Sequence, residues 1–206
     1  ELVDQRHKGL QLLRTTLGDA ALSYQQLGGF ELFLGKDKPL FETCTQKMSE
    51  VNQLLKPIFK ADVFSKVANK FKFSRIQNQY IRNQFEGQID TGNMMQELIK
   101  KVQTLGVIVL NNTKVEAYIE QPNKVSIQTP HFEFSSQKLI FTTNGFAKQL
   151  INEDVQPARA QVLITKPIDD LDIKGTFHLD CGYYYFRNID NRILLGGGRN
   201  LDIKTE

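Results

Sequence analysis

Apolar residues recur along the chain with two periods, and the period separates expected helices from expected strands. Spacing of three to four residues predicts helices in three stretches: 3–17, 38–55 and 91–105. The third helix has Asp90 or Thr91 as its expected N-cap and Gly106 as its terminator. Lysines interleaved with phenylalanines predict one more helix, 61–71, with a solvated basic face. Pro57 is expected to separate it from the helix over 38–55, because proline interrupts a helix.

The remaining apolar segments are short and are typical of strands. Expected strands cover the following ranges: 22–24, 30–34, 80–85, 114–119, 124–128 and 131–134. Two further runs, 107–110 and 139–141, are uniformly apolar, which is typical of strands covered on both faces in a parallel sheet. We expect these two runs to be adjacent and parallel. The mixture predicts an α+β fold, with an antiparallel or mixed sheet and a partial α/β segment.

The segment 183–198 (YYYFRNIDNRILLGGG) predicts a strand, a turn and a second strand that ends in glycine. Alternation places Tyr184 on one face and Tyr185 and Arg187 on the other. Tyrosine hydroxyls and a guanidinium, beside a backbone without Cβ atoms, suit a small anionic ligand, since arginine meets a carboxylate with two parallel bonds. The alternative is a half-buried hairpin of an ordinary sheet, because aromatic residues are common in strands.

Composition narrows the classes of function. The chain has 206 residues, of which 40% are hydrophobic and 24% charged, as in ordinary globular proteins. A net charge of +3 does not indicate a nucleic-acid partner, and we interpret the basic residues of 56–82 as a solvated face. Cys44 and Cys181 are the only cysteines, and no Cys or His has metal-ligand spacing, so a reducing compartment, the cytoplasm, is expected. No histidine has a partner at a recognisable catalytic spacing, and no apolar run reaches the roughly 20 residues that span a bilayer.

A dinucleotide-binding turn is missing from the sequence. No GxGxxG occurs between a first strand and a helix, where a pyrophosphate would bind. Two buried strands and one covering helix are also too few for a doubly wound sheet. We therefore expect the chain to be an internal piece of a larger protein.

Four segments carry a family resemblance by their order and spacing: 87–110 (GQIDTGNMMQELIKKVQTLGVIVL), 139–150 (LIFTTNGFAKQL), 156–164 (QPARAQVLI) and 183–198. Together they resemble the D-amino-acid-oxidase-like FAD-dependent oxidoreductases, a group that includes glycine oxidase, sarcosine oxidase and D-amino-acid dehydrogenase. The resemblance implies a two-domain flavoprotein. Residues 86–150 would belong to the FAD domain, and 1–85 and 151–206 to a substrate domain built on an antiparallel sheet.

The resemblance also implies site residues. A backbone contact with adenine falls near Val115, and a strand end that passes close to the flavin falls on Thr142, Thr143, Asn144 and Gly145. The tyrosine of the family's YxxP-like strand aligns best with Tyr184. The implied substrate-binding set is Tyr184, Tyr185, Arg187 and Gly197. The chain departs from the family at Arg187, where proline is usual, and at Arg159, Ala160 and Gln161, where Arg-Gly-Gln is usual.

The chemistry implied by the resemblance is oxidation of an amine or amino acid to an imine, with hydride passing to FAD. FAD would belong to the full-length protein, and the 206-residue chain alone is expected to carry none and to be inactive. The expected partner is a small-molecule amine or amino acid, without nucleic acid or a transmembrane segment. The alternative is a non-catalytic binding or interaction domain that descends from such an enzyme. A glycine-rich strand-to-helix turn upstream of Glu1 would favour the enzyme.

Overall fold

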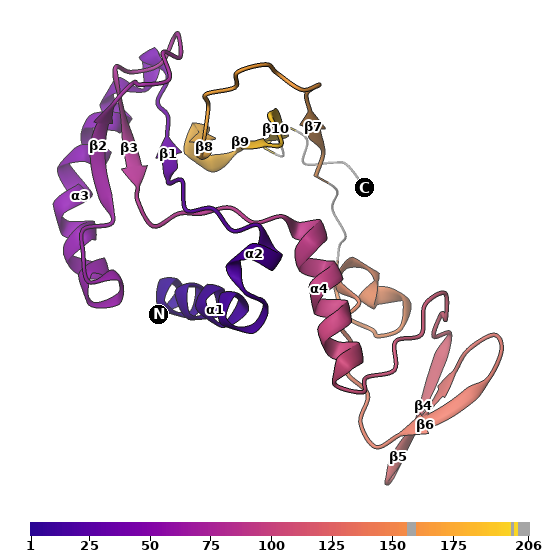
Figure 1. The fold of residues 1–206 in the computed structure, drawn as a ribbon. Coiled ribbons are helices and arrows are strands. Elements are labelled where there is room, and N and C mark those ends of the chain that lie inside the picture. Colours follow the sequence, from indigo (N-terminus) through magenta and orange to yellow (C-terminus); the bar gives the residue numbers. More distant parts are fainter. Residues whose placement is uncertain (156–159, 199, 202–206) are drawn as a thin grey trace. The chain divides into compact units, whose positions relative to one another are not determined.

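The structure, a computed structural model, describes residues 1–155, 160–198 and 200–201 (Figure 1). The chain divides into two compact units, one formed by Glu1–Lys101 and the described part of Ala160–Ile203, the other by the described part of Val102–Arg159. Each unit has its own sheet. This combination of helices with mixed and antiparallel sheets confirms the predicted α+β class.

The first unit contains a seven-stranded sheet with the order β2-β3-β1-β8-β9-β10-β7. Its strands are β1 (Gly29–Glu31), β2 (Phe64–Ala68), β3 (Gln79–Asn83), β7 (Val162–Ile164), β8 (Thr176–Leu179), β9 (Tyr184–Ile189) and β10 (Arg192–Gly197). Neighbouring strands are antiparallel except at the centre, where β1 and β8 are parallel. The sheet is therefore two antiparallel groups joined by one parallel pair.

One face of this sheet carries the aromatic core. Phe30, Phe177 and Phe186 follow one another across β1, β8 and β9, with ring centroids 5.1 and 4.6 Å apart. Phe71 and Phe73, from the segment between β2 and β3, cover these rings edge-on. Each buried aromatic side chain contributes about 1.5–3 kcal/mol, so this cluster is the main apolar stabilisation of the sheet.

Helix α3 (Lys38–Phe59) lies alongside β2 and β3 (Figure 1). Asn52 of α3 is buried, and its side chain accepts hydrogen bonds from the Val63 and Phe64 amides at 3.0 and 2.8 Å and donates to the Phe64 carbonyl at 2.9 Å. These bonds hold the backbone extended where β2 begins. The predicted helix over 61–71, with its basic face, is therefore wrong. Pro57 lies inside α3 and does not break it, because the helix continues to Phe59.

The other predicted helices are confirmed as α1 (Leu2–Leu17), α3 and α4 (Thr91–Thr104). The Asp90 carboxylate accepts from the Asn93 amide at 3.0 Å, which is the expected N-cap, and Gly106 has φ +83° just after the helix. A strand predicted over 22–24 is wrong, because α2 (Asp19–Leu22) ends there. The predicted strand over 80–85 is confirmed as β3.

The second unit contains a three-stranded antiparallel sheet, β4 (Ala117–Gln121), β5 (Lys124–Gln128) and β6 (Glu133–Ser136), followed by the 3-10 helix η2 (Asn144–Gln149). This meander matches the prediction. The runs 107–110 and 139–141 pair with no strand in the described part of the chain, and Ile108 and Ile140 are 84% and 79% exposed. The predicted adjacent, parallel pair of strands is therefore wrong, since neither run has a neighbour to supply ladder hydrogen bonds.

Candidate substrate-binding hairpin and the adjoining charged cluster

The predicted hairpin of residues 183–198, here called the tyrosine hairpin, is formed by β9 and β10. Ile189 pairs with Arg192 across a two-residue turn, in which Asp190 and Asn191 both have positive φ. A type I′ turn requires positive φ at both positions, and Asp and Asn tolerate it better than most residues. This turn sets the register that pairs Tyr184 with Gly197 at the open end of the hairpin.

Glycines at that end allow close approach of the backbone and of one tyrosine ring. A Cβ at Gly197 would lie 2.3 Å from the Tyr183 carbonyl oxygen, and its φ of +136° also excludes other residues. The half-buried ring of Tyr184 lies beside Gly198, whose added Cβ would stand 3.6 Å from it. The Tyr185 ring lies over Gly196 on the opposite face, where an added Cβ would stand 2.4 Å from the ring. The predicted residues Tyr184 and Gly197 are thus in register, and Tyr185 lies on the other face.

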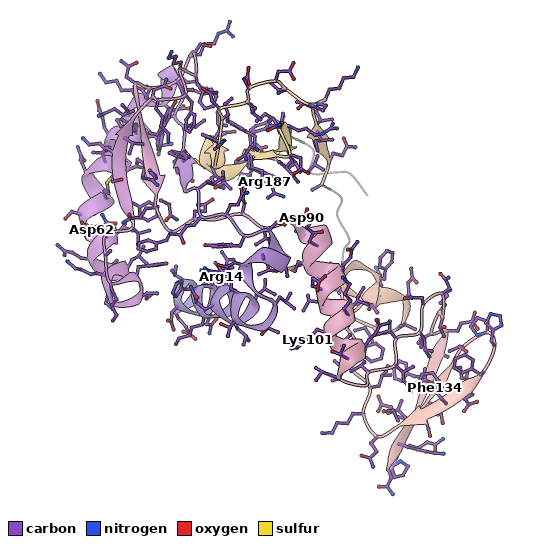
Figure 2. The ribbon with its side chains drawn as sticks, viewed as in Figure 1. Arg14, Asp62, Asp90, Lys101, Phe134 and Arg187 are labelled. Atoms are coloured by element: carbon purple, nitrogen blue, oxygen red, sulfur yellow. The ribbon has the colours of Figure 1, made fainter. Side chains whose placement is uncertain are left out.

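Arg187 has a partner within the protein. Its Nη1 donates to the Ile89 carbonyl at 2.9 Å, and Ile89 lies just before α4. Figure 2 labels Arg187 on the hairpin. Arg187 and Tyr185 share the face opposite Tyr184, as alternation predicts. A ligand on the face of Tyr184 therefore lies across the sheet from Arg187. The substrate-binding roles of these four residues stay predictions.

A charged cluster lies on the face of Tyr185 and Arg187. The Glu86 carboxylate lies 2.9 Å from His178 Nε2 and accepts a hydrogen bond from the Thr176 hydroxyl. It occupies the space above Gly29, where a Cβ would stand 2.1 Å from a carboxylate oxygen. Glu31, opposite His178 in the parallel pair, completes the set. We call Glu31, Glu86, Thr176 and His178 the Glu86 cluster.

The cluster shifts the pKa values of its members. The hydrogen bond to Glu86 is the main cause that raises the pKa of His178 above its ordinary value. Burial opposes ionisation of Glu86, but the bonds from His178 and Thr176 outweigh it and lower the pKa of that carboxyl. Burial raises the pKa of Glu31. The shifts of Glu86 and His178 favour the charged forms of both partners, and the shift of Glu31 favours its neutral form.

Sequence reasoning missed this cluster. Glu86 and His178 are 92 positions apart, and only the pairing of β8 with β1 brings them together. Neither residue has a local motif around it. A signal for it lies in Gly29, since a glycine in a strand marks the close approach of another group.

The residues that the resemblance assigned to the cofactor lie in the second unit. Val115 is half-buried just ahead of β4, whereas Thr142, Thr143 and Asn144 are exposed and lead into η2. Their hydroxyl, amide and backbone groups are the donors and acceptors that the polar parts of a flavin nucleotide require. The residues present thus fit the assignment, which stays a prediction. Arg159 lies outside the described residues.

The described ranges show neither a membrane-spanning helix nor a metal site. None of the helices there is long and apolar enough to cross a membrane. The same residues contain no group of three His, Cys, Asp or Glu side chains that could hold a metal ion.

A sequence profile described as FAD dependent oxidoreductase (DAO) matches residues 3–205. Because the match covers almost the whole chain, the chain belongs to the DAO family of FAD-dependent oxidoreductases, as predicted. No curated protein sequence matches it significantly.

Several solved structures share the fold. Iminodiacetate oxidase from Chelativorans sp. BNC1 is 17% identical with a TM-score of 0.74, covering 96% of this chain and 55% of that one. Glycine oxidase from Geobacillus kaustophilus is 12% identical with a TM-score of 0.70, covering 96% and 54%. L-proline dehydrogenase from P. horikoshii is 16% identical with a TM-score of 0.66, covering 95% and 54%. The chain thus spans about half the length of these proteins.

Proposed function

We propose that the complete protein oxidises a small amine or amino acid to an imine, with FAD as the hydride acceptor. Family membership supports the flavin, and the names of the similar structures, an iminodiacetate oxidase, a glycine oxidase and an L-proline dehydrogenase, support the substrate class. The observation that carries the proposal is the open end of the tyrosine hairpin. There, the half-buried Tyr184 ring lies beside Gly198, and Gly197 allows the close approach of the Tyr183–Tyr184 backbone.

In this proposal the first unit binds the substrate. The Tyr184 hydroxyl donates to the substrate carboxylate, and a hydrogen bond to a charged group contributes about 1.5–3 kcal/mol. Arg187 holds the hairpin to Ile89 and so positions the strand that carries Tyr184. The work of these side chains is to orient the substrate, which lowers the barrier by fixing the reacting geometry.

The second unit would contribute to the cofactor site. Val115 and the segment Thr142–Gly145 would hold FAD, which supplies the two-electron oxidant when bound. In domain terms, we assign 86–150 to the FAD domain and 1–85 and 151–206 to the substrate domain. A cytoplasmic location is part of the same proposal.

The absorption spectrum of the complete protein, as purified, tests the function. We expect a flavin spectrum that is bleached anaerobically by at least one member of a panel containing glycine, sarcosine, iminodiacetate, D-alanine and L-proline. Flavin that none of these or related amines bleaches would contradict the substrate class. A protein without flavin, even after incubation with FAD, would instead favour a non-catalytic binding domain. The 206-residue chain alone is expected to purify without flavin.

A further inference from the structure

A cavity of about 350 Å³ lies between α3 and the sheet, within the first unit. Its apolar walls are Phe33, Leu40, Met48, Val51, Phe64 and Ile81. Glu31 also lines it and shares a sheet face with His178 and Tyr185, opposite that of Tyr184. The volume falls in the range of small-molecule sites, about 300–1,000 Å³. The cavity is therefore large enough for a ligand and separate from the face of Tyr184.

The polar lining of the cavity is mainly acidic. Glu31, Asp37 and Asp180 line it, and the one basic lining residue among those described is Lys47. Lys47 pairs with Glu50 at 2.9 Å, with both side chains largely exposed, so it adds little positive charge inside. Asp37 accepts from the Leu34 amide at 3.2 Å. The net charge of the lining favours a cation.

Glu31 is an acidic lining residue whose carboxylate has no partner among the described residues. Within the described residues, its carboxylate has no hydrogen bond and no ion pair, although the side chain is partly buried. His178 is already paired with Glu86 at 2.9 Å. The Glu31 carboxylate thus has no counter-charge of its own, and its pKa is raised by burial and also by the nearby Glu86 carboxylate. A half-buried carboxylate has lost part of its hydration, and a cation bound in the cavity would supply the missing partner.

We infer that this cavity binds a hydrophobic primary amine, with its ammonium group on the Glu31 carboxylate and its hydrocarbon body between α3 and the sheet. The apolar walls select the body and Glu31 selects the charge. This site goes beyond the proposed oxidation, because it lies on the sheet face away from Tyr184 and needs no flavin.

The cysteines provide a local reporter of occupancy. Cys44 and Cys181 are the only cysteines of the chain, and both line the cavity. Cys44 is half-buried, and burial raises the pKa of its thiol, so slow alkylation is expected when the cavity is empty. A ligand that fills the cavity should slow the reaction further. Mass spectrometry of the alkylated peptides separates Cys44 from Cys181.

The experiment compares n-hexylamine with 1-hexanol and hexanoate as probes of equal length on the full chain. We expect n-hexylamine to protect Cys44 from iodoacetamide in a saturable manner, with 1-hexanol and hexanoate at least about tenfold weaker, since a charge-assisted bond is lost. Equal protection by 1-hexanol would refute recognition of the amine by Glu31. The absence of protection by n-hexylamine would refute the site.

Variants place the effect in the cavity. Glu31→Gln should weaken n-hexylamine binding about 10- to 100-fold and bring it close to that of 1-hexanol. Glu42→Gln is the matched control, because Glu42 is an exposed acid of α3 outside the cavity lining, 3.8 Å from Lys38. Equal affinities in these two variants would overturn the inference. Circular dichroism establishes that each variant is folded, and the comparison of the three probes on the unaltered chain tests the inference independently.

Discussion

Breaking the ion pair between Glu86 and His178 should reduce stability in a pH-dependent way. Glu86→Gln, His178→Asn and the double variant form a mutant cycle that isolates the pair. A hydrogen bond to a charged group contributes about 1.5–3 kcal/mol. The side chains are 30% and 29% exposed, so solvent screening reduces the expected coupling to about 1–2 kcal/mol.

The signs of the pKa shifts set the pH window. His178, whose pKa is raised by Glu86, contributes stability below its unfolded pKa of about 6.5, and this is lost as pH rises through the folded value. Glu86, whose pKa is lowered, contributes above its unfolded pKa of about 4.3, and this is lost as pH falls through the folded value. The coupling should therefore be largest near about pH 5.5 and small by about pH 9.

Urea denaturation of the four proteins at these two pH values measures the coupling. Glu31, whose pKa is raised by burial, favours the folded state below its unfolded pKa and loses this contribution as pH rises through the folded value. Because Glu31 is present in all four proteins, most of its effect cancels in the cycle. NMR titration of His178 provides a second measurement, in which Glu86→Gln should lower the imidazole pKa towards about 6.5. A coupling below about 0.3 kcal/mol at pH 5.5, or an equal one at pH 9, would refute the reasoning.

Four further changes test other features of the first unit. Asn52→Ala removes three hydrogen bonds at the start of β2 and should lower the free energy of unfolding by about 2–4 kcal/mol in urea, whereas a loss below about 1 kcal/mol would contradict the anchoring role. Gly197→Ala should destabilise the hairpin by about 2 kcal/mol or more, seen as a lower Tm, because neither its φ nor its surroundings admit a Cβ. Arg187→Ala should cost about 1–2 kcal/mol of stability through the lost bond to Ile89. Tyr184→Phe should leave stability nearly unchanged while raising KM for an amino acid about two- to tenfold in the complete enzyme; an unchanged KM would exclude substrate contact by its hydroxyl.

Local patterns predicted the elements that depend on local interactions. The N-cap at Asp90 and the two-residue turn at 190–191 are set by neighbouring residues, and both α4 and the tyrosine hairpin formed where expected. The helix predicted over 61–71 does not form, because Asn52 of the preceding helix holds the backbone extended at Val63 and Phe64. Helical spacing in that segment carried no information about this distant bond.

In the candidate site, too, features set within one strand were predicted and features set by remote strands were not. Alternation within one strand placed Tyr184 and Arg187 on opposite faces, as the structure shows. The Glu86 cluster was not predictable, because Glu86 and His178 meet only through the parallel pairing of strands that are remote in sequence. The apolar runs 107–110 and 139–141 were predicted to be strands from their composition alone, and neither forms one. Their composition is that of strands, but a strand forms only where a neighbouring backbone completes the ladder.

The single parallel pairing at the centre of the seven-stranded sheet has a consequence for folding kinetics. Strands β2, β3 and β1 come from residues before 102, and β8, β9, β10 and β7 from residues after 159, so only β1 and β8 join the two groups. Each group contains a local hairpin, β2–β3 joined by residues 69–78 and β9–β10 joined by a two-residue turn, and such hairpins close quickly. The junction must instead wait for closure of a loop that contains the whole second unit. The rate-limiting step of refolding should therefore be the meeting of Phe30 with Phe177, and a chain cut within the second unit should regain its sheet by association of the two pieces.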